Sequence, residues 1–140
     1  MRRQLRVLFG EREPGLRRGI ELVLGGAQHE LASTDNAIEL LALAHTWHPD
    51  VILAEEDLVD EQTLAALAER APTALLATAM SEPGFWRAIR GGARGYLPRA
   101  LSAERLPAVV EALARGETAL PSQMITLIVA GYNRRGRTAA

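Results

Sequence analysis

Three acidic residues directly follow a short apolar run near the middle of the chain. The run extends from Val51 to Ala54, and Glu55, Glu56 and Asp57 come next. An apolar run this short, β-branched at its start and without polar alternation, is typical of a strand buried on both faces of a parallel sheet. Its acidic end would lie at the carboxyl edge of that sheet, where open α/β folds place their sites. Carboxylates gathered there could hold a metal ion.

Three other short apolar runs also end in side chains that could do chemistry. Leu5–Phe9 is followed by Glu11 and Arg12, Ala74–Ala77 by Thr78, and Gly95–Leu97 by Pro98 and Arg99. The carboxyl ends of parallel strands meet at one edge of a sheet, which is where open α/β folds place their sites.

Five strand candidates alternate strictly with five helix candidates along the chain. The strand candidates are 5–9, 29–33, 51–54, 74–77 and 95–97, and the helix candidates are 14–24, 37–44, 60–70, 81–89 and 102–115, the second capped by Thr34 or Asp35. Each parallel crossover needs a covering helix, so the alternation predicts an α/β domain with a doubly wound five-stranded parallel sheet. With 140 residues the chain is long enough to bury a core in one such domain.

The composition is that of an ordinary globular protein, and it excludes several kinds of site. Hydrophobic residues make up 48% and charged residues 24%, and the net charge of −1 gives no overall attraction to nucleic acid or a membrane. Cysteine is absent, which excludes disulfides, thiolate metal ligands and cysteine nucleophiles. All 16 basic residues are arginine, so no mechanism can use a lysine ammonium. Without a signal-type start or a long apolar segment, the chain is expected to be cytoplasmic.

The last stretch of the chain departs from the alternation. Residues 121–132 are apolar nearly all round, and residues 133–140 form a small basic tail that we expect to be frayed. A helix apolar on all sides is unstable in water, so it should pack on the domain and on a second copy, or lead into a linker. The sequence therefore predicts a domain at residues 1–118, a short C-terminal apolar linker helix with its tail at 119–140, and a homodimer.

Several motifs, taken in this order, resemble the receiver domain of bacterial response regulators, which belong to two-component systems. The motifs are Pro49–Leu53 before an acid, Thr78-Ala79 at a strand end, and Gly92–Leu97, which reads GARGYL. This hexapeptide, with Gly116-Glu117 and Leu120–Ser122 after it, is similar to the NarL-type subfamily. The resemblance covers roughly residues 4–118 and implies a (βα)5 flavodoxin-like receiver fold. It also implies transcription regulation through a downstream DNA-binding domain, for which too few residues follow Gly116.

The resemblance assigns a role to each residue of the predicted pocket, and most of these residues depart from the family pattern. A receiver has an acidic pair after its first strand, an aspartate phospho-acceptor after the third, a Thr or Ser after the fourth and a lysine after the fifth. The corresponding positions here are the altered pair Glu11 and Arg12, the acceptor position Glu55, the hydroxyl Thr78 and the lysine position Arg99, with Tyr96 as the switch aromatic. Only Thr78 matches, so we expect a degenerate pocket without catalytic residues.

Arg12 stands where a receiver supplies a direct carboxylate ligand for Mg²⁺, and a cation there repels the metal. Arg99 adds a second guanidinium, so the pocket is close to neutral without an ion, and we expect neither a metal nor another cofactor. Either Arg12 or Arg99 should pair with Glu55 and replace the magnesium structurally, because a guanidinium suits a bidentate grip on a carboxylate.

Two interpretations of Glu55 follow from this pocket. In the first, its carboxylate mimics a phosphoryl group, Thr78 hydrogen bonds to it, and Tyr96 turns inward. In the second, the pocket is structurally neutral, because a single carboxylate seldom supplies a large population shift. Asp57 would be a substitute acceptor if the strand continued to it, since it would then share the face of Glu55.

The sequence therefore predicts a phosphorylation-independent pseudo-receiver that acts through dimerisation and is not an enzyme. One alternative is a ligand sensor in which Arg12 and Arg99 grip a small anionic molecule, and another is a stand-alone protein-interaction module. An enzyme using Glu11 and Glu55 as acid and base would lack a phosphate loop and a nucleophile. His45 and His48 have the spacing of two metal ligands, but the sequence offers no third.

Overall fold

A five-stranded parallel sheet forms the centre of the protein, as the alternating pattern predicted. The computed structural model describes residues 3–139, and its strands are β1 Arg6–Gly10, β2 Glu30–Thr34, β3 Val51–Glu55, β4 Thr73–Ala77 and β5 Gly95–Pro98. Their order is β2-β1-β3-β4-β5, and all neighbouring strands are parallel. The winding reverses between β1 and β3, which is where α/β sheets of this kind place their sites.

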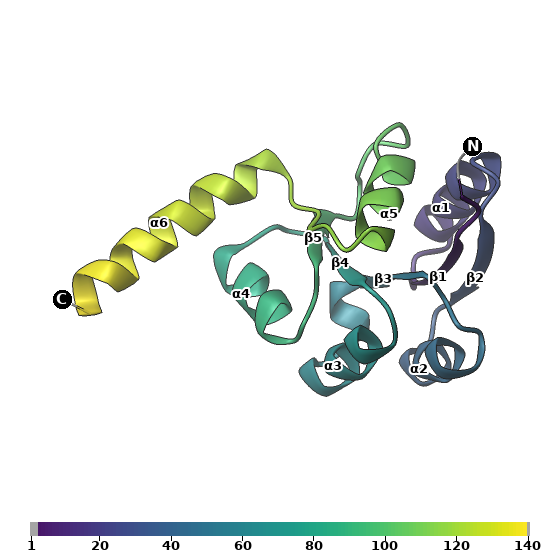
Figure 1. Cartoon of the computed structure of the whole chain (residues 1–140), viewed down its shortest axis with the longest axis horizontal. Coiled ribbons are helices and arrows are strands. Elements are labelled where there is room, and N and C mark those ends of the chain that lie inside the picture. The colour runs from purple at the N-terminus through teal and green to yellow at the C-terminus, as the bar shows by residue number, and fades with distance from the viewer. Residues whose placement is uncertain (1–2, 140) are drawn as a thin grey trace.

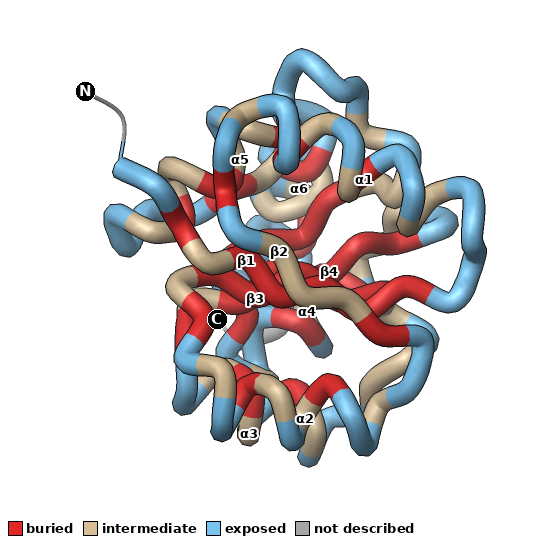
Figure 2. The backbone as a smooth tube through the Cα atoms, turned by 90° about the vertical axis from the view of Figure 1, so that its right-hand side faces the viewer, coloured by how far each residue is buried: buried red, intermediate tan, exposed pale blue. Residues whose placement is uncertain are grey.

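Helices cover both faces of the sheet, so the molecule has three layers (Figures 1 and 2). The helices are α1 Pro14–Gly26, α2 Ala37–Thr46, α3 Glu61–Arg70, α4 Glu82–Arg90, α5 Leu106–Ala114 and α6 Ser122–Ala139, with a short 3-10 helix, η1, at Glu56–Leu58. One face carries α1 and α5, and the other carries α2, α3 and α4. In the described part of the chain, every helix is too short or too polar to span a bilayer.

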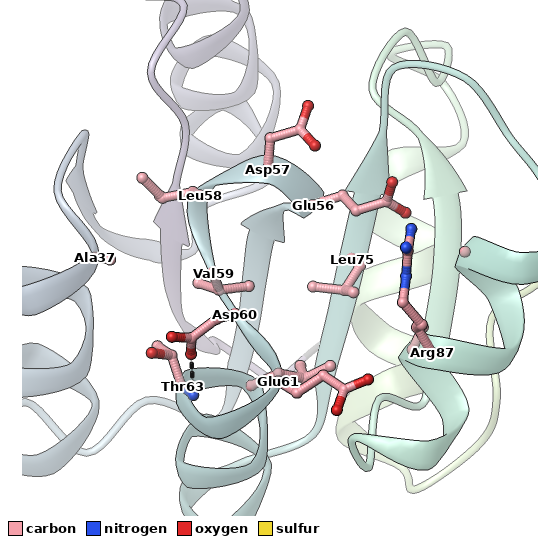
Figure 3. Close-up of a pocket in the computed structure, with 13 residues that line it drawn as sticks. Ala37, Glu56, Asp57, Leu58, Val59, Asp60, Glu61, Thr63, Leu75 and Arg87 are labelled. Atoms are coloured by element: carbon pink, nitrogen blue, oxygen red, sulfur yellow. Dashed lines mark hydrogen bonds between the residues drawn. The ribbon is translucent and has the colours of Figure 1, made fainter.

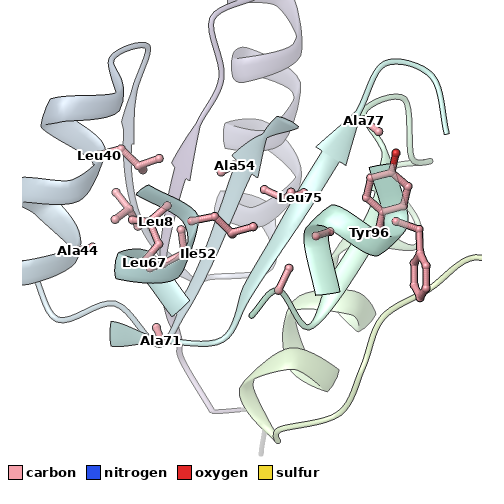
Figure 4. Packing of buried hydrophobic residues seen from close by; sticks show 14 of the residues in the cluster. Leu8, Leu40, Ala44, Ile52, Ala54, Leu67, Ala71, Leu75, Ala77 and Tyr96 are labelled. Carbon is pink, nitrogen blue, oxygen red and sulfur yellow. The ribbon is translucent and has the colours of Figure 1, made fainter. Parts of the chain in front are cut away.

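The central strands supply side chains to both layers of the core in strict alternation. Val7 and Val51 point to the layer of α1 and α5, whereas Leu8 and Ile52 point to the layer of α2, α3 and α4 (Figure 4). This is the two-residue period of a strand, and because both faces are covered, all of these side chains are buried. The unbroken apolar runs therefore predicted these strands correctly.

Polar side chains cap the helices that lead away from the carboxyl edge. Asp60 and Ser81 accept hydrogen bonds from the backbone N–H groups of Thr63 and Gly84, which fixes where α3 and α4 begin. The predicted cap of α2 was wrong. Asn36 caps that helix, and the Thr34 hydroxyl instead accepts the backbone N–H of Asn36, two residues along the chain.

Two helix boundaries also differ from the prediction. The helix expected from Ser102 begins at Leu106, because Pro107 lacks an amide hydrogen and fits only the first turn of a helix. The basic tail expected to be frayed is helical, since α6 continues to Ala139. The tail's last residue, Ala140, lies outside the described residues.

The segment between α5 and α6 is hydrogen bonded to the outer edge of β5. The backbone N–H of Tyr96 donates to the carbonyl of Ala119 at 3.1 Å, and the N–H of Ala119 donates to the carbonyl of Arg94 at 2.9 Å. Met124, in the first turn of α6, is fully buried in the same core as α4. Helix α6 is thus connected to the sheet edge before it runs along α4.

Replacing Leu8 by alanine should lower the free energy of unfolding by about 2–5 kcal/mol, because it leaves a cavity between the sheet and α2. Replacing the highly exposed Ile38 of α2 by alanine should change it by less than about 0.5 kcal/mol. Urea unfolding followed by circular dichroism measures both. Equal effects of the two substitutions would contradict the layered core described above.

Candidate functional site

The strand ends bring the predicted pocket residues together at the carboxyl edge of the sheet. The ends of β1 and β3 are in register, so Glu11 and Glu55 stand side by side at neighbouring positions. The ends of β4 and β5 are in register as well, which places Thr78 beside Arg99. The sheet therefore brings together the pocket residues that the resemblance predicted.

Arg12 binds the carboxylate of Glu55. Its Nη2 lies 2.5 Å from Oε1 of Glu55, and its Nε lies 3.1 Å from each of the two carboxylate oxygens. The backbone N–H of Arg12 donates to Oε2 of Glu55 at 3.0 Å. Glu55 is only 2% exposed, so this cation and this amide replace the water that the carboxylate loses on folding.

Arg99 binds the carboxylate of Glu11 in the same forked manner. Its Nε and Nη2 each lie 2.8 Å from a different oxygen of Glu11, which is also buried. Its third nitrogen, Nη1, donates to the hydroxyl of Thr78 at 2.8 Å. Nη2 of Arg99 also comes within 3.9 Å of Glu55, so the two ion pairs form one cluster of alternating charge.

The sequence predicted that Arg12 or Arg99 would pair with Glu55, and Arg12 is the one that does. The hydrogen bond from Thr78 to Glu55 that mimicry would use is not formed in this structure. The Thr78 hydroxyl is bound to Arg99, and both oxygens of Glu55 are bound to Arg12. Arg12 pairs with Glu55, and Arg99 pairs with Glu11. The Thr78 hydroxyl is bound by Arg99, whose guanidinium lies nearest to β4.

The ion pair with Arg12 strongly lowers the pKa of Glu55. Hydrogen bonds from the Arg12 side chain, with that from its backbone amide, lower the pKa of Glu55 to about 2, although burial acts in the opposite direction. The same hydrogen bond and the charge of Glu55 raise the pKa of Arg12. The acceptor position is therefore a carboxylate locked in its charged form at neutral pH.

Tyr96 is turned inward, and its ring is fully buried (Figure 4). The ring packs edge-on against Phe85 of α4 with 6.3 Å between ring centres, and its hydroxyl accepts the backbone N–H of Ser81 at 3.4 Å. Burial, together with the neighbouring Glu56, raises the pKa of the Tyr96 hydroxyl. Gly84 makes this position accessible, because a Cβ at residue 84 would overlap the hydroxyl of Tyr96.

Asp57 lies outside the charge cluster, because the condition for sharing a face with Glu55, a strand that continues to Asp57, is not met. The strand ends at Glu55 and turns into η1, so the two-residue period no longer applies. Asp57 is exposed and lines a separate pocket of about 490 Å³ between α3 and α4 (Figure 3). Sequence reasoning missed this pocket, because it depends on how the short connection from β3 to α3 packs against α4.

Four acidic side chains line this second pocket, together with apolar residues that include Val59, Leu64 and Leu75. The acidic residues are Glu56, Asp57, Asp60 and Glu61, with Arg87 on the α4 side. Figure 3 shows the guanidinium of Arg87 pointing toward the carboxylate of Glu56. One oxygen of Glu56 is buried without a hydrogen-bond partner among the described residues.

The charge cluster does not fit a magnesium ion. Mg²⁺ needs several oxygen ligands at short range in octahedral geometry, but the oxygens of Glu11 and Glu55 already bind guanidinium groups. Arg12 would place a positive charge beside the ion. Within residues 3–139, no group of three or more His, Asp or Glu side chains is arranged to hold a metal, so His45 and His48 also lack further ligands.

Comparison with known proteins gives a clear result for the fold. No protein-family model matches the chain, and no curated protein matches its sequence. Among solved structures, the receiver domain of the putative response regulator NarL from Mycobacterium tuberculosis is similar, with a TM-score of 0.75, 21% identity, and coverage of 83% of this chain and 100% of that one. This chain has the receiver-domain fold.

Two further solved structures agree with this receiver-domain fold. A LuxR-family two-component response regulator from an Aurantimonas species superposes with a TM-score of 0.83 and 16% identity, covering 93% of this chain and 99% of that one. A LuxR-family DNA-binding response regulator from Silicibacter pomeroyi gives a TM-score of 0.73 and 22% identity over 85% and 98% of the two chains. The match that covers 93% of this chain includes part of α6, so this receiver-like fold extends beyond the five strand and helix pairs.

We expect the stability of the protein to fall between about pH 4.5 and pH 2 because of Glu55. The pKa of Glu55 is lowered in the folded state from its ordinary value of 4.5 to about 2. A lowered folded-state pKa means that the charged form stabilises the fold above pH 4.5, and that this contribution is lost as the pH falls toward the folded-state pKa. Urea unfolding at a series of pH values measures the loss.

The variant Glu55→Gln separates this effect from general acid denaturation. It should be less stable than the wild type at pH 7, and the difference should narrow toward pH 2, where Glu55 of the wild type also becomes neutral. Glu69→Gln, on the exposed side of α3, should follow the wild type at all pH values. A difference between Glu55→Gln and the wild type that does not depend on pH would contradict the assignment.

Gly84→Ala should destabilise the protein by about 1–3 kcal/mol, because its Cβ would press on the Tyr96 hydroxyl. The same substitution in a Tyr96→Phe background should cost at least about 1 kcal/mol less, since the overlapping oxygen is gone. A double-mutant cycle by urea unfolding measures this coupling. Additive effects would mean that Tyr96 can leave its buried position at little cost.

Proposed function

We propose that this protein is a pseudo-receiver, a non-enzymatic regulatory module that works without phosphorylation. In this proposal the module acts by dimerisation in two-component-type signalling, and it regulates transcription through a DNA-binding domain that is joined to it or recruited by it. The receiver-domain fold supports the signalling context. The paired charges at the carboxyl edge support independence from phosphorylation.

The observation that supports this function best is the forked pair of Arg12 and Glu55. Phosphoryl transfer requires an acceptor oxygen that is free to attack and a metal ion that neutralises the moving group. Here both oxygens of Glu55 accept hydrogen bonds from Arg12, whose guanidinium already places a positive charge at this carboxylate. The low pKa of Glu55 keeps this pair charged throughout the physiological range.

Between the two interpretations of Glu55, the contacts favour a structurally neutral pocket over a mimic of the phosphorylated state. A mimic would present its charge to Thr78, but that hydroxyl is bound to Arg99. The negative charge of Glu55 is neutralised by a cation of the same pocket. The inward Tyr96 is held by Phe85 and Ser81 of the α4 region, independently of Glu55.

A sensor of small anions at Arg12 and Arg99 is the second candidate, and the geometry supports it less well. An anion would have to displace Glu55 or Glu11, each of which is buried and already bound to its guanidinium. Displacement would leave a buried carboxylate without a cation, which costs free energy. Arg12 is the more accessible of the two, since its side chain is half exposed.

We expect no acid-labile phosphoryl adduct after incubation of the protein with acetyl phosphate and Mg²⁺. The measurement is intact mass at neutral pH, before and after mild acid treatment. The triple variant Arg12→Asp, Glu55→Asp, Arg99→Lys serves as a matched positive control, because it restores the acidic pair, the acceptor and the lysine expected of a receiver.

An adduct on the wild-type chain would contradict the proposed function, and two further variants would locate it. Loss of the adduct in Glu55→Gln would assign phosphorylation to the acceptor position. Loss in Asp57→Asn would assign it to the exposed aspartate of η1 instead.

A further inference from the structure

We infer that a second copy of this chain covers the outer face of α6, in an antiparallel helix pair with Val129 at its centre. This inference rests on the proposed function insofar as that function requires a dimer. It goes further by naming the surface, the orientation of the two copies and the residues that meet.

The inner face of α6 is fixed by contacts with α4 of the same chain. Glu82 of α4 binds the Arg134 side chain and also accepts the indole N–H of Trp86. The guanidinium of Arg135 lies 4.2 Å from the centre of the Trp86 ring, a cation–π contact. Gly131 allows this close approach, because a Cβ there would overlap the carboxylate of Glu82.

These contacts determine which side of α6 faces away from the molecule. Ile125, Val129 and Tyr132 are 57%, 52% and 72% exposed. Their spacing of four and three residues places them in one row along a helix. We call this row the outer stripe of α6. Helix α6 lies on the outside of the molecule (Figure 1), and the exposed fractions of its three residues show that the stripe is accessible.

The surroundings of the outer stripe are those of a small protein interface. The exposed residues of α6 beside Ile125 and Val129 are uncharged, namely Ser122, Gln123, Thr126 and Asn133, whereas the exposed Arg134 and Arg135 follow Tyr132. The part of the stripe around Ile125 and Val129 can therefore be desolvated without stripping water from charged groups. Helix α6 contains no acidic residue, and its arginines Arg134 and Arg135 lie beyond the C-terminal end of the stripe.

The spacing of the outer stripe favours a second copy of this chain as the occupant. Ile125 lies four residues before Val129, and Tyr132 lies three residues after it. A two-fold axis through Val129 therefore brings Val129 against Val129 of the other copy, and Ile125 against Tyr132 of the other copy. Such an interface uses the same patch twice, which is how most homodimers are built.

Charge selects the antiparallel orientation over the parallel one. The cationic residues of α6 are Arg134, Arg135 and Arg137, which all lie in its last part. A parallel pair would place these two arginine clusters side by side. An antiparallel pair places each cluster beside the uncharged first turns of the other helix, and Glu82 and Trp86 keep their contacts with Arg134 and Arg135.

The absence of cysteine allows a direct test with single cysteine variants of the full chain. Val129→Cys should form a covalent dimer under mild oxidation or with a short bismaleimide, because the two copies of this residue meet on the axis. Ile125→Cys and Tyr132→Cys should each cross-link poorly alone, but a mixture of these two variants should give a heterodimer. Ile38→Cys, on α2 and 82% exposed, is the matched control for collisional cross-linking.

Each possible result of the cross-linking either supports or overturns the inference. Covalent dimers of Val129→Cys that form at least about tenfold faster than those of Ile38→Cys, with the mixed Ile125 and Tyr132 pair, support it. Efficient cross-linking of Ile125→Cys with itself would overturn the antiparallel orientation. Cross-linking of Val129→Cys at the rate of Ile38→Cys would overturn the surface itself.

Sedimentation equilibrium distinguishes a failure of this inference from a failure of the proposed function. Val129→Asp should raise the dissociation constant of the dimer more than about tenfold, while Ile38→Asp should leave it within about twofold. Circular dichroism verifies that both variants keep their helices. A Val129→Asp protein as dimeric as the wild type would refute the outer stripe but leave dimerisation intact. A wild-type chain that stays monomeric would refute both.

Discussion

Two carboxylates at the carboxyl edge of the sheet are buried, and a buried carboxylate stays charged only with a cation and hydrogen-bond donors beside it. Glu11 and Glu55 meet this requirement through Arg12 and Arg99, which come from segments far apart in the sequence. The connection from β1 to α1 must therefore reach the end of β3, and the end of β5 must reach the end of β1. In a receiver with an acidic pocket, a bound cation could satisfy the same electrostatic requirement.

The choice of arginine follows from the geometry of these contacts. Arg99 uses three nitrogen atoms at once, two for the carboxylate of Glu11 and one for the hydroxyl of Thr78. A lysine ammonium is a compact point charge and could not span these acceptors from one position. Removal of one partner from a buried ion pair is strongly destabilising, because it leaves an uncompensated charge. The position of Arg99 therefore requires the arginine side chain that is present.

The sequence predicted the sheet well, because buried parallel strands are short apolar runs and the alternation leaves few topologies. The resemblance to receiver domains also predicted which residues meet at the carboxyl edge. It did not determine which partner each residue takes. Thr78 binds Arg99 because Arg12 already occupies Glu55, and Asp57 leaves the site because the chain turns into η1. The helical tail was missed because its order depends on Trp86, a contact between distant segments.

The hydrogen bonds of Ala119 complete a ring of contacts that connects β5, α4 and α6. The carbonyl of Ala119 holds the backbone of Tyr96, whose hydroxyl meets the start of α4 at Ser81. Helix α4 in turn holds α6, which begins three residues after Ala119. A force on α6 therefore reaches β5 by two routes, one through the backbone and one through α4. Because Arg99 directly follows β5, the same strand connects α6 to the charged pocket.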